Sequence, residues 1–422
     1  MPGAPRGSRP ALLRACAHRL IVTAAVVFGV ALIAAMLAEE QAWAGWIPTT
    51  ISKWQDSTVL ATPAWAALAA YIGAPHRASS IRELEHLSER PRIWHLRAVI
   101  ALGLAASLSQ ALVFAAMALR TSSLGRAGSG QVPWVPLAGM TGVVMGSVWA
   151  AVAWGFLCGR KLPSLVSVPA AAIAPYFLNV LLVSYGGTGA LPALGSSDAS
   201  GWDFAVPTNE SAILRALWWV ALAFLLVAVA AGARGWLRPL TWFALGALIA
   251  NLVMPPTWRD IPNADDVVCV EGSPDFCVNG SWEAALPAYS TYAEKLFSVL
   301  PSSATPDRIA PLAYAENPDV WTVAFDPSSR VPHRAETIAQ LAYATVDGTC
   351  SNGHSDSQWL AAAAIASWAL SEVRVSGEFS DEPSIAAAAE RLNQMDSAER
   401  ESWFRHNAEA IRRCALDVEA LP

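Results

Sequence analysis

Long runs of hydrophobic residues alternate with short polar segments over the first 258 residues of the chain. A helix needs about 20 mainly apolar residues to cross a bilayer. Seven runs approach or reach that length: residues 20–38, 57–74, 98–119, 135–157, 162–183, 213–231 and 239–256. The pattern therefore predicts seven transmembrane helices. The weakest are 57–74, which contains Pro63, and 239–256, which is the least hydrophobic.

Shorter helix signals replace the long runs after Trp258. Asp396 and Glu399 have the spacing of a helix N-terminus, and an apolar stripe follows them at helical intervals. The stripe consists of Phe404, Ala408, Ile411, Ala415 and Val418. Further helices are predicted at 282–300, which must accommodate Pro287; from Pro332 to about Val346; at 358–373, after Asp356; and from Pro383. Residues 320–325 have the pattern of a single short strand.

Composition supports a membrane domain followed by a soluble one. The chain is 54% hydrophobic and 15% charged, which excludes an ordinary soluble protein of 422 residues. Residues 1–258 carry 17 Lys and Arg against 9 Asp and Glu, whereas residues 259–422 carry 11 against 25. We predict an all-α polytopic membrane domain over 1–258, then a mainly helical, disulfide-linked soluble domain with at most a small sheet over 259–422. The acidic tail argues against nucleic-acid binding.

Positive charges predict the orientation, since Lys and Arg are enriched in cytoplasmic loops. Four arginines precede the first run, five lie between residues 75 and 97, and two short turns at 160–161 and 234–238 are also basic. With seven spans, all of these segments are cytoplasmic. We expect a multi-pass protein of the bacterial plasma membrane with a cytoplasmic N-terminus and an extracytoplasmic C-terminal domain. An outer aromatic belt would contain Trp43, Trp46, Trp54, Trp134 and Trp258.

Cysteines indicate an oxidising compartment for the tail. Four of the six lie there: Cys269, Cys277, Cys350 and Cys414. An even number in a domain outside the cytoplasm predicts disulfides. Three pairings exist, and we favour Cys269 with Cys277 because Gly272 and Pro274 supply a turn between them. That choice leaves Cys350 to pair with Cys414.

The motifs of several enzyme classes are absent from the sequence. No glycine-rich loop ends in Lys-Ser or Lys-Thr, so the chain alone is not expected to hydrolyse ATP. The zinc-protease and serine-hydrolase motifs are also missing. We expect no metal and no cofactor. Glu39 and Glu40 offer an alternative, because lipid-linked sugar transferases use acidic residues in the first outer loop and Trp43 and Trp46 could stack on a sugar ring.

Polar residues and prolines inside the predicted spans mark candidates for a substrate path. The polar candidates are Gln110, Asn179 and Asn251. Intramembrane polar groups either form hydrogen bonds between helices or line a path. Residues 162–183 also contain Pro163, Pro169 and Pro175, which we expect to kink or break the helix beside a cavity or neighbouring helices.

The long cytoplasmic loop contains a predicted amphipathic helix. Ser80 and Glu83 form a capping box, and Pro91 ends the segment. Its candidate partner-binding residues are Arg82, Leu84, Glu85, Leu87, Glu89 and Arg90. The helix either docks onto a cytoplasmic partner or rests on lipid headgroups.

This layout resembles the transmembrane subunit of type-2 ABC transporters, in which a cytoplasmic helix couples to a separate ATPase. Residues 79–92 match that helix in position only. The tail resembles the extracytoplasmic domain of an uncharacterised, permease-like bacterial family through Val268-Cys269, Ser273–Cys277 and the ending Trp403–Cys414. The chain departs from the transporter class by adding a seventh span and an outer domain.

The resemblance implies a permease-like subunit working with a separate ATPase. One alternative is a membrane-anchored extracytoplasmic binding or sensor protein without transport, and a second is a lipid-linked sugar transferase using Glu39 and Glu40. The expected partners are the bilayer, a cytoplasmic ABC ATPase and, as an open alternative, a second copy of the chain in a homodimer. Neither the substrate nor the direction of transport follows from the sequence.

Overall fold

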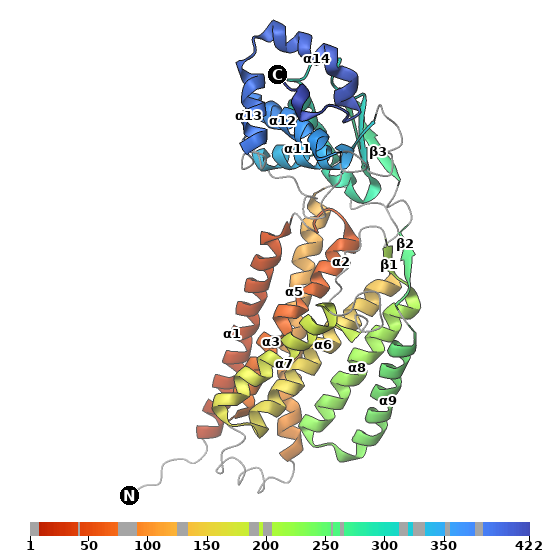
Figure 1. The fold of residues 1–422 in the computed structure, drawn as a ribbon. Coiled ribbons are helices and arrows are strands. Elements are labelled where there is room, and N and C mark those ends of the chain that lie inside the picture. Colours follow the sequence, from red (N-terminus) through yellow and green to blue (C-terminus); the bar gives the residue numbers. More distant parts are fainter. Residues whose placement is uncertain are drawn as a thin grey trace, which may run out of the picture. The chain divides into compact units, whose positions relative to one another are not determined.

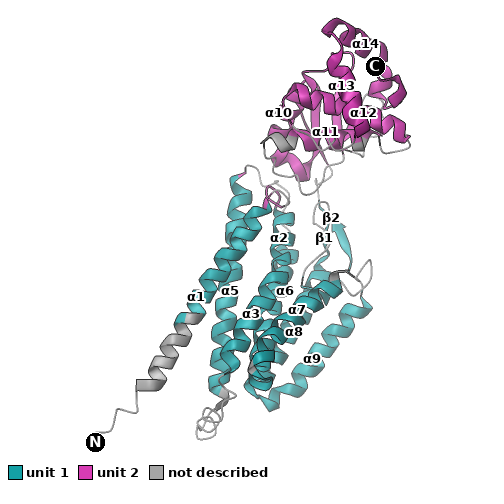
Figure 2. Ribbon diagram, turned by 60° about the vertical axis from the view of Figure 1, so that its left-hand side comes forward, with its two compact units in different colours: residues 1–39, 47–123, 131–261 teal, residues 40–46, 124–130, 262–422 magenta. Residues whose placement is uncertain are grey.

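The computed structural model describes residues 8–40, 43–74, 91–124, 134–184, 194–196, 205–254, 256–261, 266–311, 320–323, 334–350, 355–375 and 383–422. Contacts divide the chain into two compact units (Figure 2). The helical unit consists of residues 1–39, 47–123 and 131–261, and the C-terminal unit consists of residues 40–46, 124–130 and 262–422. The boundary follows Ile261 rather than Trp258, because β2 (Trp258–Asp260) pairs with β1 (Ala205–Pro207) of the helical unit.

Helices form nearly all of the described helical unit (Figure 1). They are α1 (Ser8–Ala38), α2 (Ile47–Asp56), α3 (Thr58–Gly73), α5 (Pro91–Ser123), α6 (Trp134–Lys161), α7 (Ser164–Ser184), α8 (Asn209–Ala231) and α9 (Arg234–Val253). Six of these, α1 and α5 to α9, are long and apolar enough to cross a membrane. The predicted span 57–74 corresponds to α3, which at 16 residues is shorter than a full crossing. The six long helices are compatible with a multi-pass membrane protein.

Helix α2 lies in a segment that the sequence pattern assigned to a loop. It is amphipathic, and seven of its ten residues are buried, including Trp54. The indole nitrogen of Trp54 donates to the backbone oxygen of Gln110 on α5, at 3.0 Å. An apolar-run search misses such a helix, because only one of its faces is apolar.

Helix α6 is the centre of the helical unit, with 16 of its 28 residues buried. Gly155 and Gly159 face the backbone of Ala66 and Ala70 on α3 so closely that a β-carbon at either glycine would collide with it. On another face, a β-carbon at Gly142 would lie 2.8 Å from the β-carbon of Ala216 on α8. Small residues let helix backbones approach closely in membranes.

Helix α7 corrects the prediction of a break in the span 162–183. It runs without interruption from Ser164 to Ser184, with Pro169 and Pro175 inside it. Pro163 lies immediately before the helix, and its carbonyl accepts from the amides of Val166 and Ser167. Proline is tolerated at a helix start, where its missing N–H would have no partner in the helix.

The C-terminal unit combines helices with one four-stranded sheet. The strands are β3 (Val267–Val270), β4 (Asp275–Asn279), β5 (Arg308–Pro311) and β6 (Val320–Val323), in the order β3-β4-β5-β6. The β3/β4 pair is antiparallel, and the other two pairs are parallel. The sequence predicted only the last strand, whose residues 324–325 lie outside the described part. The others are only four or five residues long, so the local pattern was too weak to find them.

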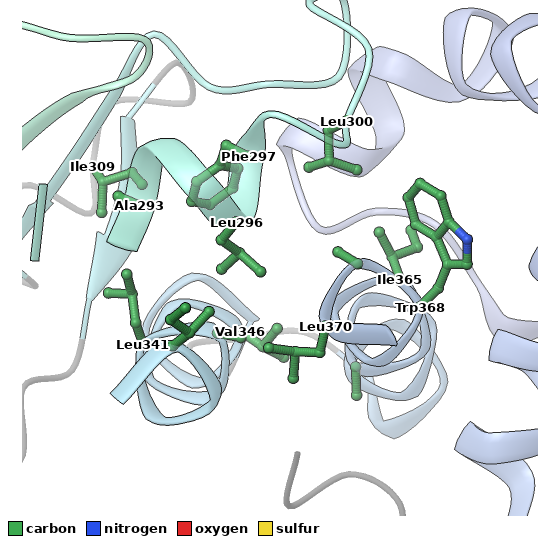
Figure 3. Packing of buried hydrophobic residues seen from close by; sticks show 14 of the residues in the cluster. Ala293, Leu296, Phe297, Leu300, Ile309, Leu341, Val346, Ile365, Trp368 and Leu370 are labelled. Carbon is green, nitrogen blue, oxygen red and sulfur yellow. The ribbon is translucent and has the colours of Figure 1, made fainter. Parts of the chain in front are cut away.

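Its helices are α10 (Leu286–Phe297), α11 (Arg334–Cys350), α12 (Asp356–Glu372), α13 (Pro383–Gln394) and α14 (Ser397–Arg412), with short 3-10 helices at Gly280–Ala285 and Val418–Ala420. Side chains of α10, α11 and α12 point into a shared apolar core (Figure 3). Helix α10 begins at Leu286 instead of Trp282, because Pro287 occupies the first turn. Pro332, the predicted start of α11, lies outside the described residues.

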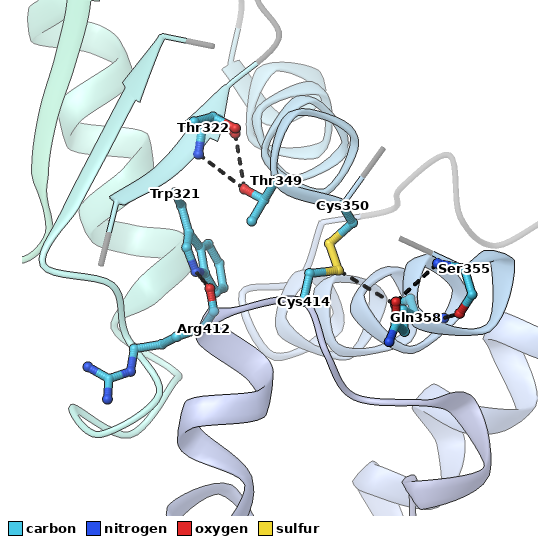
Figure 4. Close-up of a disulfide and its surroundings, with 8 residues drawn as sticks. All are labelled: Trp321, Thr322, Thr349, Cys350, Ser355, Gln358, Arg412 and Cys414. Carbon is cyan, nitrogen blue, oxygen red and sulfur yellow. Dashed lines mark hydrogen bonds between the residues drawn. A yellow bond between two sulfur atoms is a disulfide. The ribbon is translucent and has the colours of Figure 1, made fainter. Parts of the chain in front are cut away.

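Capping explains the ends of the last helices. Asp396 accepts from the amides of Ala398 and Glu399 at the start of α14, as predicted. Helix α12 is capped by Ser355, one residue before the predicted Asp356, in a capping box with Gln358 (Figure 4). The buried stripe of α14 ends at Ile411, because the helix stops at Arg412 before Ala415 and Val418.

Both favoured disulfides are present. Cys269 and Cys277 lie opposite each other on β3 and β4. Cys350 at the end of α11 is joined to Cys414 just after α14 (Figure 4). Trp321 supports the same region, since its indole nitrogen donates to the backbone oxygen of Arg412 at 2.8 Å. The C-terminal unit is therefore cross-linked near both ends of its chain segment.

Candidate functional site

A cavity of about 320 Å³ lies between α3, α6, α7 and α8 of the helical unit. Most of its lining is apolar. The side chains in the lining with hydrogen-bonding groups are Thr62 on α3, Ser147 and Trp154 on α6, Asn179 on α7 and Trp219 on α8. The cavity thus combines a mainly apolar wall with a few hydrogen-bonding groups, as small-molecule sites do.

Asn179 is the centre of a buried hydrogen-bond network beside this cavity. Its Oδ1 accepts from the hydroxyl of Ser196 at 2.7 Å and from the Ser196 amide at 3.2 Å. Its Nδ2 donates to the hydroxyl of Thr62 at 3.4 Å. The hydroxyls of Thr58 and Ser196 lie 2.8 Å apart. One amide side chain therefore joins α7 to α3 and to residues 194–196.

Residues 194–196 form a short segment between α7 and α8. Gly195 and Ser196 are buried. The carbonyl of Gly195 accepts from Arg215 Nη2 at 3.4 Å and from Trp219 Nε1 at 3.3 Å. Helices α3, α7 and α8 thus contribute polar side chains that hold this short segment. One of these side chains, Arg215, is only 3% exposed. A buried ionisable group in a membrane helix is a marker of functional sites.

The other two polar candidates lie elsewhere. Gln110 accepts from the Ser57 hydroxyl at 3.1 Å and ties α5 to the junction of α2 and α3. Asn251 donates to the carbonyls of Leu214 and Ala247, both at 2.9 Å, and ties α9 to α8. Neither side chain lines the cavity, so the geometry favours interhelical hydrogen bonding for both. Of the two prolines, Pro175 lines the cavity and Pro169 does not.

The surroundings of Glu39 weaken the sugar-transferase hypothesis. Its carboxylate lies 2.6 Å from the ammonium group of Lys53. Trp43 and Trp46 are 0% and 3% exposed, so they present no face on which a sugar could stack. They also do not form part of an outer belt, nor does Trp54 at 2%. Only Trp134 and Trp258 of the predicted belt are substantially exposed, at 72% and 38%.

The predicted partner-binding residues 82–90 lie outside the described residues, so their role stays a prediction. Cys350 is oxidised in a disulfide and offers no thiolate. Within the described ranges, no cluster of three or more His, Cys, Asp or Glu could hold a metal ion.

Sequence reasoning missed several members of the network and the glycine contacts of α6. Thr58 and Thr62 are spaced four apart and therefore share a helix face. Arg215 interrupts an apolar run, which was a visible signal. The pairs Gly142 with Gly146 and Gly155 with Gly159 each match the G-x-x-x-G pattern of close helix packing. Ser196 gave no local signal, because its partners are 17 and 138 residues away.

Comparison of the chain with known protein families, curated proteins and solved structures found no match.

Proposed function

We propose that this protein is a permease-like membrane subunit that binds its substrate in the cavity beside Asn179 and works with a separate ATPase. The cavity is the observation that carries the proposal. Its volume of about 320 Å³ suits a small molecule. Because the lining is mostly apolar, the substrate has a mainly apolar body and few hydrogen-bonding groups.

The packing of α3 supports a seven-pass topology despite its short length. Ala66 of α3 faces Gly155 of α6, and Ala70 faces Gly159, so the two helices run parallel. A single long helix, α5, separates them among the described elements. Two parallel helices with one return helix between them cross the membrane in the same direction. That arrangement supports the proposal that α3 crosses the membrane, with the C-terminus on the side opposite the N-terminus.

Charges and cysteines support the orientation. Arg160, at the end of α6, donates to the carbonyl of Ala230 near the end of α8, at 3.0 Å. The basic C-terminal end of α6 and the turn between α8 and α9 therefore lie at the same end of the helical unit. By the positive-inside rule, a basic end of this kind is expected on the cytoplasmic side. The two disulfides of the C-terminal unit suit the oxidising side.

A sensor without transport remains the second candidate, because a cavity can bind a ligand without moving it. An ATPase partner separates the two functions. We expect an ABC-type ATPase to co-purify with the tagged full chain from native membranes. The sequence places Leu84 and Leu87 on the apolar side of the predicted cytoplasmic helix, where each buried leucine would contribute roughly 1.5–3 kcal/mol. The double variant Leu84→Asp, Leu87→Asp should therefore lose the ATPase while still inserting in the membrane.

His86→Asp is the matched control in the same helix, since it introduces the same charge at a position outside the candidate partner-binding residues. This variant should retain the ATPase. Retention by the double leucine variant at wild-type yield would show that this helix does not couple to the partner. Absence of any ATPase from the wild-type preparation would favour the sensor function.

The cavity itself is tested by filling it. Ala174 lines the cavity, whereas its neighbour Ile173 does not and is 58% exposed. We expect Ala174→Trp to deplete the small molecule that co-purifies with the wild-type chain, measured by mass spectrometry of extracts. Ile173→Trp adds the same side chain outside the cavity and should leave the molecule bound. Equal recovery from both variants would exclude this cavity as the binding site.

A further inference from the structure

Helix α9 has one buried side and one broad exposed side. Its buried residues are Ala244, Ala247 and Asn251. The two alanines pack with Ala221 of α8, and the helices lie side by side (Figure 1). The side-chain amide of Asn251 donates to the carbonyl of Leu214 on α8 at 2.9 Å. The opposite side of α9 therefore faces away from the rest of the helical unit.

This outward side carries a stripe of exposed residues whose chemistry changes along the helix. Six residues recur at intervals of three or four and therefore lie within an arc of about 80° on the helix surface. They are Arg234, Arg238, Trp242, Leu245, Ile249 and Leu252. Trp242 is 72% exposed, and the three aliphatic side chains are 40–50% exposed. This α9 stripe thus begins with two cations, continues with an indole and ends with aliphatic groups.

The helices around the basic end of the stripe supply no acidic residue to neutralise it. Helices α6, α7 and α9 contain no Asp or Glu. Glu210 is the one acidic residue of α8, and it lies at the end of that helix farthest from Arg234. Arg160 of α6 adds positive charge nearby, because it donates to the carbonyl of Ala230, four residues before Arg234, at 3.0 Å. Neither arginine of the stripe forms an ion pair with a described residue.

A phospholipid presents complementary groups in the same order: a phosphate, then ester groups, then acyl chains. Guanidinium groups bind phosphate oxygens through parallel hydrogen bonds. Indole rings favour the interface between headgroups and acyl chains, because they combine an apolar body with one N–H donor. A zwitterionic headgroup carries its own cation beside the phosphate, whereas an anionic headgroup does not. Two adjacent arginines therefore favour an anionic lipid.

A second copy of the chain fits this side of α9 less well. Copies of a membrane protein share one orientation in the bilayer, so a symmetric dimer would bring the same patch of both subunits together. A contact through the α9 stripe would then place the two arginines of one copy opposite those of the other. Juxtaposed like charges oppose association.

We propose that the α9 stripe is a binding site for an anionic phospholipid. The lipid phosphate pairs with Arg234 and Arg238. Trp242 lies level with the ester groups, and one acyl chain packs along Leu245 and Ile249. The site requires α9 to lie in the membrane, and it is independent of transport and of an ATPase. With the orientation proposed above, the bound lipid belongs to the cytoplasmic leaflet.

Native mass spectrometry of the full chain, released from detergent micelles, tests the site. The chain is incubated with equal amounts of phosphatidylglycerol and phosphatidylcholine that carry the same acyl chains. We expect the wild type to retain phosphatidylglycerol in roughly fivefold excess, because charge-assisted contacts to phosphate are strong. Glycerol 3-phosphate, which has the phosphate but no acyl chains, should not displace the bound lipid.

Variants locate the lipid on α9. Arg234→Gln with Arg238→Gln should abolish most of the excess of phosphatidylglycerol. Arg19→Gln with Arg97→Gln is the matched control, because it removes the same charge from exposed arginines near the predicted cytoplasmic ends of α1 and α5. The control should keep the wild-type excess. All four arginines are exposed, so both double variants should fold, and a thermal midpoint confirms it.

Any of four results would overturn the proposal. The first is equal retention of the two lipids by the wild type. The second is an equal loss in both double variants, which would indicate a general effect of positive charge. The third is displacement by glycerol 3-phosphate, which would indicate a site for soluble phosphates. The fourth is a dimer that Trp242→Ala separates, which would assign this side of α9 to a second copy.

Discussion

Asn179 shows how much one buried side chain organises in the helical unit. Its amide contacts Thr62 on one side and Ser196 on the other, and it lines the cavity. In a membrane helix an asparagine is costly unless its hydrogen bonds are made. Here they join a helix, a neighbouring helix and a short buried segment. The residue thus has a structural role as well as a place in the proposed site.

Asn179→Leu should destabilise the helical unit, because the hydroxyl and amide of Ser196 would lose their buried acceptor. We expect a loss of about 1–3 kcal/mol in the free energy of unfolding. The measurement is the thermal midpoint of the full chain in detergent. Thr241→Val removes an exposed hydroxyl that bonds only within α9 and should change the midpoint little. A midpoint unchanged in Asn179→Leu would show that the network does not stabilise the fold.

At the scale of helices, α6 explains why the helical unit is compact. Its glycines meet α3 at Gly155 and Gly159 and α8 at Gly142 and Gly146. Neither α3 nor α8 could approach so closely if these positions carried side chains. The cavity opens between the same helices, so its shape depends on these contacts.

Gly155→Val should separate α6 from α3, because its side chain would meet the backbone of Ala66. Overpacking of this kind typically costs about 1–3 kcal/mol. We expect a lower thermal midpoint and less monodisperse protein in size-exclusion chromatography. Gly246→Val on α9 is the matched control, since nothing lies within 4 Å of its β-carbon position. Similar losses in both variants would mean that valine acts through helix propensity rather than packing.

For the molecule as a whole, the two disulfides should differ in importance. Cys350 and Cys414 are 64 residues apart, whereas Cys269 and Cys277 are 8 apart. In the chain-entropy model, the longer loop contributes roughly 4 kcal/mol and the shorter one roughly 2.5 kcal/mol. The longer cross-link therefore restricts the unfolded chain more.

Cys350→Ala with Cys414→Ala should accordingly lower the urea midpoint of the C-terminal unit more than Cys269→Ala with Cys277→Ala does. Proteolysis of the full chain in increasing urea, followed by fragment mass analysis, measures the midpoint for this unit. The two double variants are controls for each other, since each removes one disulfide. A larger loss from the 269–277 pair would contradict the loop-length argument.

Orientation is also a property of the whole molecule. A reporter that is active only outside the cytoplasm, fused after Pro422, should give signal if α3 crosses the membrane with the six longer helices. The same reporter fused after residue 161, at the basic end of α6, should give none. Signal from a cytoplasmic reporter at Pro422 would mean that α3 or α9 does not cross.

The sequence alone determined the positions of the long helices, the change of character near Trp258 and the two disulfide pairs. Each depends on a strong local signal: an apolar run, a shift in charge, or cysteines flanking a turn. The cap at Asp396 and the start of α13 at Pro383 follow from the same local chemistry. These features depend on interactions between residues that are close together in the sequence, so a local sequence pattern is enough to predict them.

Only the tertiary structure decided which polar residues meet. Asn179, Gln110 and Asn251 look alike in the sequence, but of these three only Asn179 lines the cavity between α3, α6, α7 and α8. Ser196 and the strands β5 and β6 depend on partners farther along the chain. Such sites are set by which helix faces pack together, and close backbone contacts such as those of Gly155 and Gly159 determine that packing.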